Sequence, residues 1–120
     1  MSTLKITLSA ELNGVQLAGY PKTRRLEVDE SQSFSTEQAT GGGYSTLPIQ
    51  QLGEVQALIL EPDQDVTLRL DGQSDAGLEI KKGGLVVLFD VTIDAGASTN
   101  ATISNSSGNT VNLVGIAGGT

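Results

Sequence analysis

The sequence predicts an all-β fold: an antiparallel sandwich, a jelly roll or a small barrel of about eight or nine short strands, with negligible helix. Three features support this prediction. Apolar and polar residues alternate with a period of two along much of the chain. Turn-forming pairs such as Asn13-Gly14 and Asp71-Gly72 recur about every eight to twelve residues. No apolar repeat with the helical period of 3.6 persists for three turns. The length of 120 residues fits a single domain, residues 1–120.

The first thirty residues predict a hairpin followed by a third strand. Residues 4–8 alternate between apolar and polar types, and the apolar positions resume at residues 15–17. Between them, Asn13-Gly14 favours the positive φ angles of a type I′ turn, so the hairpin is expected to close there. A third strand is expected over residues 24–29, with Leu26 and Val28 on one face and Arg25, Glu27 and Asp29 on the other.

Residues 30–48 are polar and are interpreted as a loop or arm of the single domain. A connection of this length inside a compact domain is commonly functional, although a plain surface loop is an equal alternative. Phe34 stands almost alone among polar residues, so it is expected to dock onto another surface of this chain or of a partner. A short strand is expected over Ser33–Gln38.

The remaining strands follow from apolar runs separated by turn residues. Leu85–Phe89 is the most apolar stretch, and we expect it to be buried on both faces, at the centre of the domain or at a subunit contact. Because the core of so small a domain is limited, this stretch predicts a homo-oligomer, with a trimer favoured. Residues 99–104 and 110–116 are expected to form a terminal hairpin. Further strands are expected over residues 55–60, 66–70, 78–80 and 91–93.

Charge and composition exclude several classes of function. Fourteen acidic residues against seven basic ones give a net charge of −7, which argues against nucleic acid and against an anionic membrane as partners. The chain has no Cys and no His, the residues of most catalytic triads and zinc sites. No apolar run approaches the roughly 18 residues of a membrane span, and no signal peptide is expected. We therefore expect a binding protein rather than an enzyme, with no cofactor and no metal.

Two acidic groups were weighed as sites for chemistry. Asp71-Gly72-Gln73-Ser74-Asp75, with Asp63 and Asp65 before it, offers the oxygen ligands of a calcium loop but lacks the spacing of an EF-hand, so a simple turn is favoured. A second group could supply a carboxylate pair for cleaving a glycosidic bond, but it alternates along an expected strand and is better interpreted as a solvated face. Its members are Glu27, Asp29 and Glu30.

Four residues are candidates for binding a partner. Arg24 and Arg25, with Lys22, concentrate positive charge in an acidic chain. Such a cluster either clamps an acidic partner surface or neutralises the carboxylates that follow it, and both interpretations stay open. Phe34 is expected to act as the apolar anchor of the contact, and Tyr44 is the fourth candidate.

Several segments of the second half resemble small virion proteins of tailed bacteriophages. The resemblance extends over about residues 58–120, and it is carried by Leu68–Gln73, Gly83–Leu88, Thr99–Gly108 and Leu113–Thr120. It implies an all-β capsid decoration (cement) protein, commonly trimeric, that binds the major capsid protein and resides in the virion after assembly in the host cytoplasm. It implies no particular binding residue. The alternative is a carbohydrate- or receptor-binding module of a phage tail or a cell surface, and a small carboxylate enzyme is a third.

Overall fold

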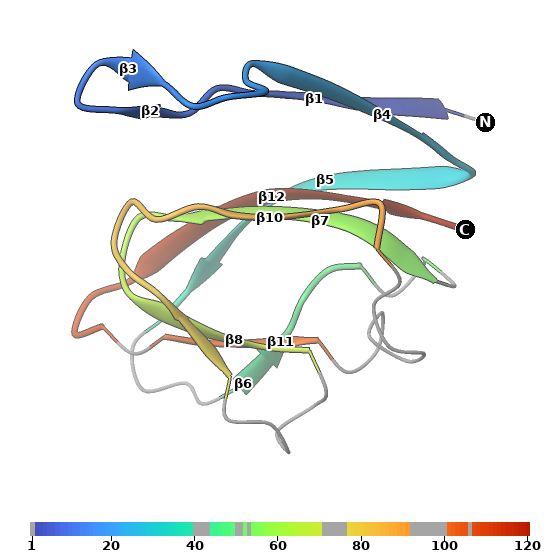
Figure 1. Ribbon diagram of the computed structural model, residues 1–120. Coiled ribbons are helices and arrows are strands. Elements are labelled where there is room, and N and C mark those ends of the chain that lie inside the picture. Colours follow the sequence, from blue (N-terminus) through green and yellow to red (C-terminus); the bar gives the residue numbers. More distant parts are fainter. Residues whose placement is uncertain are drawn as a thin grey trace.

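The computed structural model describes residues 2–39, 44–49, 52, 54–70, 77–91, 101–105 and 107–120. These residues form only antiparallel strands and contain no helix, so the predicted all-β class is confirmed. Figure 1 shows three layers: an N-terminal ribbon above, one four-stranded sheet beneath it, and a second four-stranded sheet below. The arrangement is sandwich-like, and no sheet of the described residues closes into a barrel.

The described residues hold twelve strands, more than the eight or nine expected, because several are very short. The middle sheet has the order β10-β7-β12-β5, and its strands are β10 (Val86–Phe89), β7 (Val55–Pro62), β12 (Val111–Gly119) and β5 (Glu30–Gln38). The lower sheet has the order β6-β11-β8-β9, with β6 (Tyr44–Thr46), β11 (Thr102–Asn105), β8 (Val66–Arg69) and β9 (Leu78–Ile80). The upper ribbon pairs β1 (Ser2–Leu8) with β4 (Lys22–Val28), and its end is the pair β2 (Glu11–Leu12) and β3 (Val15–Gln16).

The hydrophobic core fills the space between the middle and lower sheets. Both sheets contribute side chains that are at most 4 % exposed. Alternation along the strands explains much of this burial, since every second residue of β8 is buried, as are Leu58, Leu60 and Pro62 in the second half of β7. The buried apolar cluster comprises Leu47, Ile49, Leu52, Val55, Leu58, Leu60, Val66, Leu68, Ile80, Ala101, Ile103, Val111, Leu113 and Ala117.

The polar segment that was interpreted as a loop is largely strand. β5 pairs with β12 along its whole length, from Glu30 opposite Gly119 to Gln38 opposite Val111, and residues 44–46 form β6. The loop interpretation is therefore wrong for these residues, whereas the strand expected over Ser33–Gln38 is present and three residues longer at its start. This segment has few apolar residues, and its hydrogen bonding to β12 holds it in the strand conformation. The Gly41–Gly43 run lies outside the described residues.

Phe34 belongs to the protein's own interior and is not a free docking residue. It lies opposite Gly115 of β12 and packs against the core cluster. A Cβ atom at Gly115 would come within 2.6 Å of Phe34 Cζ, so the ring occupies the space that a side chain would take. The expectation that Phe34 anchors a partner is therefore corrected.

Two further expectations about the second half need correction. Leu85–Phe89 is not fully buried on both faces, because Leu85 is exposed and β10, the edge strand of the middle sheet, is half-buried; a subunit contact at this strand stays a prediction. Its two faces nevertheless both meet apolar neighbours: Val86 and Leu88 pack against the core, while Val87 and Phe89 point toward the upper ribbon. The expected terminal hairpin is absent, since β11 pairs with β6 and β8, whereas β12 pairs with β5 and β7.

The connection between β11 and β12 is an arch from the lower to the middle sheet, organised by Asn105. Its side-chain amide donates to the carbonyl oxygens of Gln38 (3.2 Å) and Asn109 (2.7 Å). Its Oδ1 accepts from the backbone N–H of Ser107 at 3.0 Å. This is the local hydrogen bonding with which Asn shapes turns, and it directs the chain to the other sheet.

The structure confirms the turn at Asn13-Gly14 and most of the expected strands. Asn13 and Gly14 have φ angles of 53° and 79°, as a type I′ turn requires. The expected strands over residues 24–29, 55–60, 66–70 and 78–80 correspond to β4, β7, β8 and β9. Val91 follows β10 without being strand, and residues 92–93 lie outside the described part of the chain. The possible calcium loop, residues 71–75, also lies outside it.

Replacing the inward-facing aromatic of β5 tests its place in the core. Phe34→Ala should lower the free energy of unfolding by about 2 kcal/mol, because it empties space beside the core cluster. The neighbouring Ser35→Ala, on the exposed face of β5, should change it by less than about 0.5 kcal/mol. Urea unfolding of both variants makes the comparison, and an unchanged midpoint for Phe34→Ala would contradict the placement.

Asp63 ties the turn after β7 to β12 and should make stability depend on pH. Its Oδ1 accepts a hydrogen bond from the backbone N–H of Asn112 at 2.7 Å, and its Oδ2 accepts one from the side-chain amide of Asn112 at 3.2 Å. These hydrogen bonds lower the pKa of Asp63 below its ordinary value of 3.8. The stabilisation is thus present above pH 3.8 and is lost as the pH falls through the lowered pKa. Asp63→Asn should therefore destabilise the protein at pH 7, by an amount that becomes smaller as the pH falls below 3.8. Urea unfolding of both proteins at a series of pH values from 7 downward measures this difference, and a difference that stays the same at every pH would contradict the prediction.

Candidate functional site

The upper ribbon, residues 2–28, is a separate layer with two unlike faces, and we call it the arm. Directly opposite residues of β1 and β4 share a face, so the register assigns every side chain. The outer face is polar, with Thr3 donating to Glu27 Oε1 at 2.6 Å. The outer face consists of Thr3, Lys5, Thr7, Thr23, Arg25 and Glu27. The inner face turns toward the middle sheet and consists of Leu4, Ile6, Leu8, Leu26 and Val28, together with Lys22 and Arg24.

The arm is attached to the body at its root, next to β12. Val28 is 1 % exposed, and a Cβ atom at Gly118 would lie 3.1 Å from Val28 Cγ1 and 3.6 Å from Leu4 Cδ2. The backbone N–H of Asp29 donates to the carbonyl oxygen of Gly119 at 2.9 Å. Because Gly118 has no side chain, the arm packs directly against the middle sheet.

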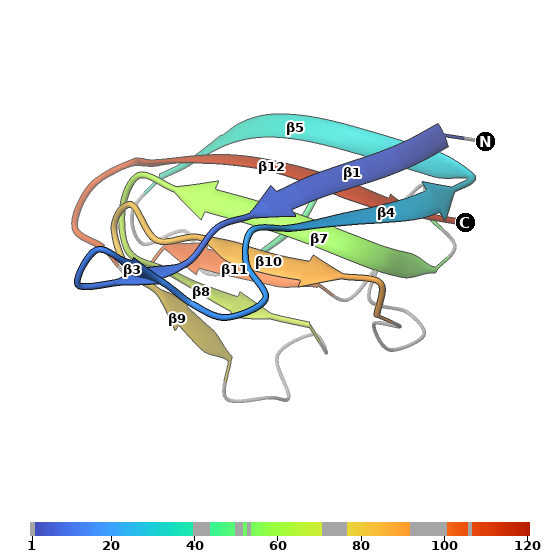
Figure 2. The same ribbon diagram turned by 45° about the horizontal axis from the view of Figure 1, so that its top comes forward.

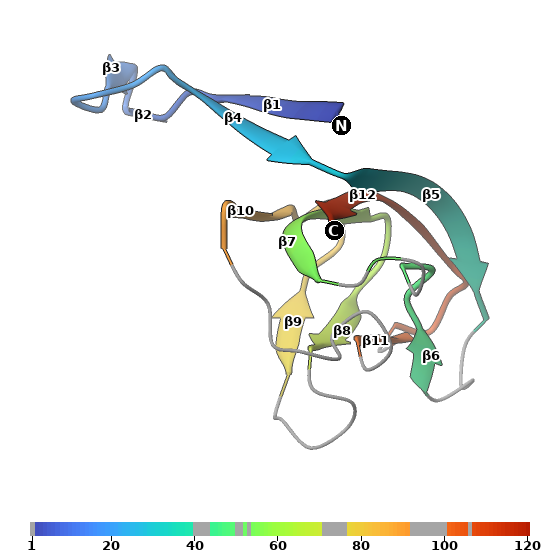
Figure 3. The same cartoon turned by 90° about the vertical axis from the view of Figure 1, so that its right-hand side faces the viewer.

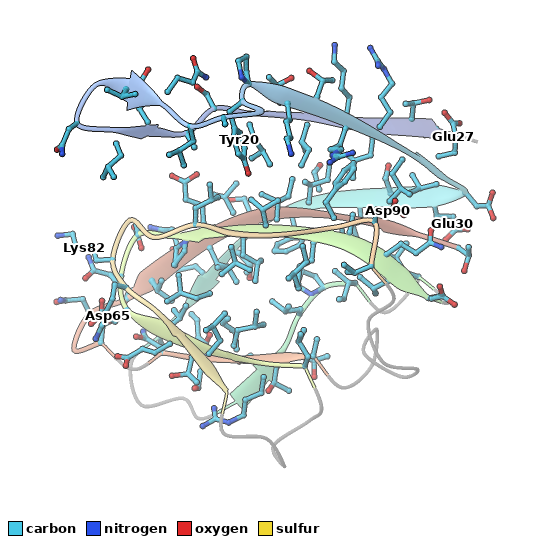
Figure 4. The ribbon with its side chains drawn as sticks, viewed as in Figure 1. Tyr20, Glu27, Glu30, Asp65, Lys82 and Asp90 are labelled. Atoms are coloured by element: carbon cyan, nitrogen blue, oxygen red, sulfur yellow. The ribbon has the colours of Figure 1, made fainter. Side chains whose placement is uncertain are left out.

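A groove opens between the arm and β10, away from the root. Its volume is about 420 Å³, within the range of ligand-binding pockets. Apolar side chains come from both layers, and one charged residue of each sign lies beside them. The lining residues are Ile6, Leu8, Arg24, Val87, Phe89 and Asp90. Figure 4 shows Asp90 at the end of β10, below the arm.

The far end of the arm, which we call the tip, carries exposed apolar side chains. Leu12 and Val15 lie opposite each other across the Asn13-Gly14 turn and are 66 % and 69 % exposed, and Leu17 beside them is 46 % exposed. Figure 3 shows the tip projecting past the edge strand β10 and beyond the sandwich. The body therefore leaves the apolar surface of the tip uncovered.

The four residues expected to bind a partner do not come together. Arg24 lines the groove, whereas Arg25 lies on the outer face of the arm, so one contact cannot use both as a pair. Phe34 lies between the two sheets of the body. The backbone of Tyr44 pairs with Ser104 in the lower sheet, and its side chain is outside the described part.

The arm is basic and the rest of the chain is strongly acidic. Four of the seven basic residues lie on the arm, and they form no ion pair with any described residue, although Lys22 Nζ lies 5.2 Å from the centre of the Tyr20 ring. Two acidic residues on the arm leave it with a charge of +2, and three basic and twelve acidic residues elsewhere give −9. The cluster therefore has no direct ion-pair partner among the described residues. The basic residues are Lys5, Lys22, Arg24 and Arg25, and the acidic ones are Glu11 and Glu27.

The sequence analysis did not identify the arm as a layer of its own. Two signals in the sequence bear on it: the positive charge of residues 2–28 in an acidic chain, and the apolar residues that flank the Asn13-Gly14 turn. Neither signal shows that β1 pairs with β4 above a sheet, because that depends on contacts with β12.

Comparison with protein families and with curated proteins gives no match. No protein-family model matches the chain. No curated protein is significantly similar to it. Among the described residues, no three or more His, Cys, Asp or Glu side chains are placed to hold a metal ion. The described residues also include no helix long and apolar enough to cross a membrane.

The close approach at the root predicts how the arm can be loosened. In Gly118→Val the new methyl groups must displace Val28, so the backbone amides of β1 and β4 should exchange hydrogen faster, while those of β8 and β11 keep their protection. Hydrogen-exchange mass spectrometry measures both sets. Unchanged exchange in the arm would show that the contact at Gly118 does not hold it; Val114→Thr, at an exposed position of the same strand, is the control.

Proposed function

We propose that this chain is a structural virion protein that decorates and stabilises a bacteriophage capsid by binding the major capsid protein as a homotrimer. The observation that carries the proposal is the arm, a β-ribbon on a largely acidic body, whose basic side chains form no ion pair with any described residue. The resemblance of residues 58–120 to small virion proteins of tailed phages supports the same class. A decoration protein needs an attachment surface and no catalytic apparatus, and the arm offers such a surface.

The outer face of the arm is the surface that would meet the capsid. Lys5 and Arg25 lie directly opposite each other on it, and both are exposed. Figure 2, viewed with the top of the molecule brought forward, shows β1 and β4 lying in front of the middle sheet. Exposed charges of one sign speed the encounter with an oppositely charged surface and orient the two partners. Many copies on one particle would multiply a modest contact.

The groove favours a second candidate, a carbohydrate- or receptor-binding module. Phe89 offers an aromatic side chain, and Arg24 and Asp90 offer hydrogen-bonding groups beside it. A glycan array probed with the purified protein tests this function. Binding to a defined sugar that Phe89→Leu abolishes would favour it over capsid decoration.

Sedimentation with undecorated phage particles tests the proposed function. The wild type should pellet with heads, and Lys5→Glu combined with Arg25→Glu should weaken attachment roughly tenfold at low salt, with a smaller effect at high salt. The control, Lys81→Glu combined with Lys82→Glu, makes the same change of charge on the body, where Figure 4 shows Lys82. Equal loss in both double variants would assign the effect to net charge, and failure of the wild type to pellet would refute the proposal.

A further inference from the structure

The tip presents apolar surface that its own molecule does not use. The positive φ angles of the Asn13-Gly14 turn place Leu12 opposite Val15, so the two side chains share one face of the ribbon. Together with Leu17 they form an exposed apolar end to the ribbon. Clustered exposed apolar side chains of this kind mark interaction sites.

The groove beneath the arm is the complementary surface. Ile6, Leu8, Val87 and Phe89 line it, and at about 420 Å³ it is large enough for the side chains of a narrow ribbon. The tip cannot enter its own groove, because Leu8 already lines it and the ribbon leads from there away from the body, as Figure 3 shows. The tip of another molecule is not restricted in this way and can enter the groove.

The charge distribution indicates that this other molecule is a second copy of the same chain. The arm carries +2 and the remainder −9. The arm of one copy and the body of another therefore carry opposite net charges, which favours their approach. At the groove itself, the tip brings one charged residue, the acidic Glu11, and the groove holds Arg24 of the receiving arm as well as Asp90 of the body.

We propose that the tip of one copy inserts into the groove beneath the arm of the next copy. Each copy then contributes one tip and one groove, a head-to-tail contact that closes into a ring when the rotation between copies permits. The groove is complete only when Leu12 and Val15 of the neighbouring copy fill it. This inference deepens the proposed function and rests on the homo-oligomer that it contains.

Cross-linking of single-cysteine variants tests the contact, because the chain has no cysteine of its own. In the test mixture, the Val15→Cys and Arg24→Cys variants are unfolded together in urea, refolded and oxidised. The control mixture contains Arg25→Cys in place of Arg24→Cys. Residue 25 lies on the opposite face of the same strand. A disulfide needs Cα atoms within about 7 Å, so the first mixture should give at least about fivefold more cross-linked dimer. Equal yields from the two mixtures would overturn the proposal.

A second measurement uses variants with no new covalent bond. Leu12→Thr combined with Val15→Thr should leave the melting temperature of the dilute, dissociated protein unchanged and weaken self-association about tenfold or more, as the loss of a central apolar contact does. Leu78→Thr, a similarly exposed residue of β9, should leave association unchanged. Light scattering behind a sizing column gives the masses. A wild-type mass of 12.4 kDa at every micromolar concentration, or full association of the double variant, would refute the contact.

Both measurements are made without phage particles, so the two proposals can fail separately. Wild type that pellets with heads but neither cross-links nor self-associates would refute the tip-to-groove contact and leave capsid binding in place. Rings that form through the tip but never pellet with heads would refute capsid decoration and leave the contact in place.

Discussion

The absence of side chains at two glycines of β12 is the constraint on which the three layers depend. β12 pairs with β5 on one side and β7 on the other, so it holds the middle sheet together. On its lower face, Gly115 leaves room for the ring of Phe34, and on its upper face, Gly118 leaves room for Val28 of the arm. A Cβ atom at either glycine would crowd these neighbours. One strand therefore joins the core below to the arm above.

The two apolar faces of the middle sheet are therefore covered to different extents. Its lower face is sealed by the second sheet, whereas its upper face is covered only by a two-stranded ribbon. Val87 and Phe89 on that face remain half-buried, and the groove lies beside them. An incompletely covered face next to a basic ribbon suits association better than catalysis. The proposed binding surface thus follows from how the arm is attached, since contact at the root leaves the far end projecting.

The candidate site was only partly predictable. That Arg24 and Arg25 face opposite ways follows from strand geometry alone, since neighbouring residues of a strand alternate between its faces. The expectation that both arginines share one contact therefore conflicts with the strand predicted over residues 24–29. The position of Phe34 could not be found in this way, because it depends on pairing with Gly115, which is far along the chain. The groove likewise needs side chains from β1, β4 and β10, which no local pattern connects.

The sequence by itself determined the all-β class, the turn at Asn13-Gly14 and the faces of β4, because period, turn chemistry and side-chain alternation act between near neighbours. Only the tertiary structure decided that the polar strand begins already at Glu30 and pairs with β12, that β10 lies at an edge, and that β11 and β12 lie in different sheets. These outcomes depend on which distant backbones hydrogen-bond and which apolar faces meet. The pairing that forms is the one that buries the most apolar surface over the whole chain, so it cannot be predicted from a local stretch of sequence.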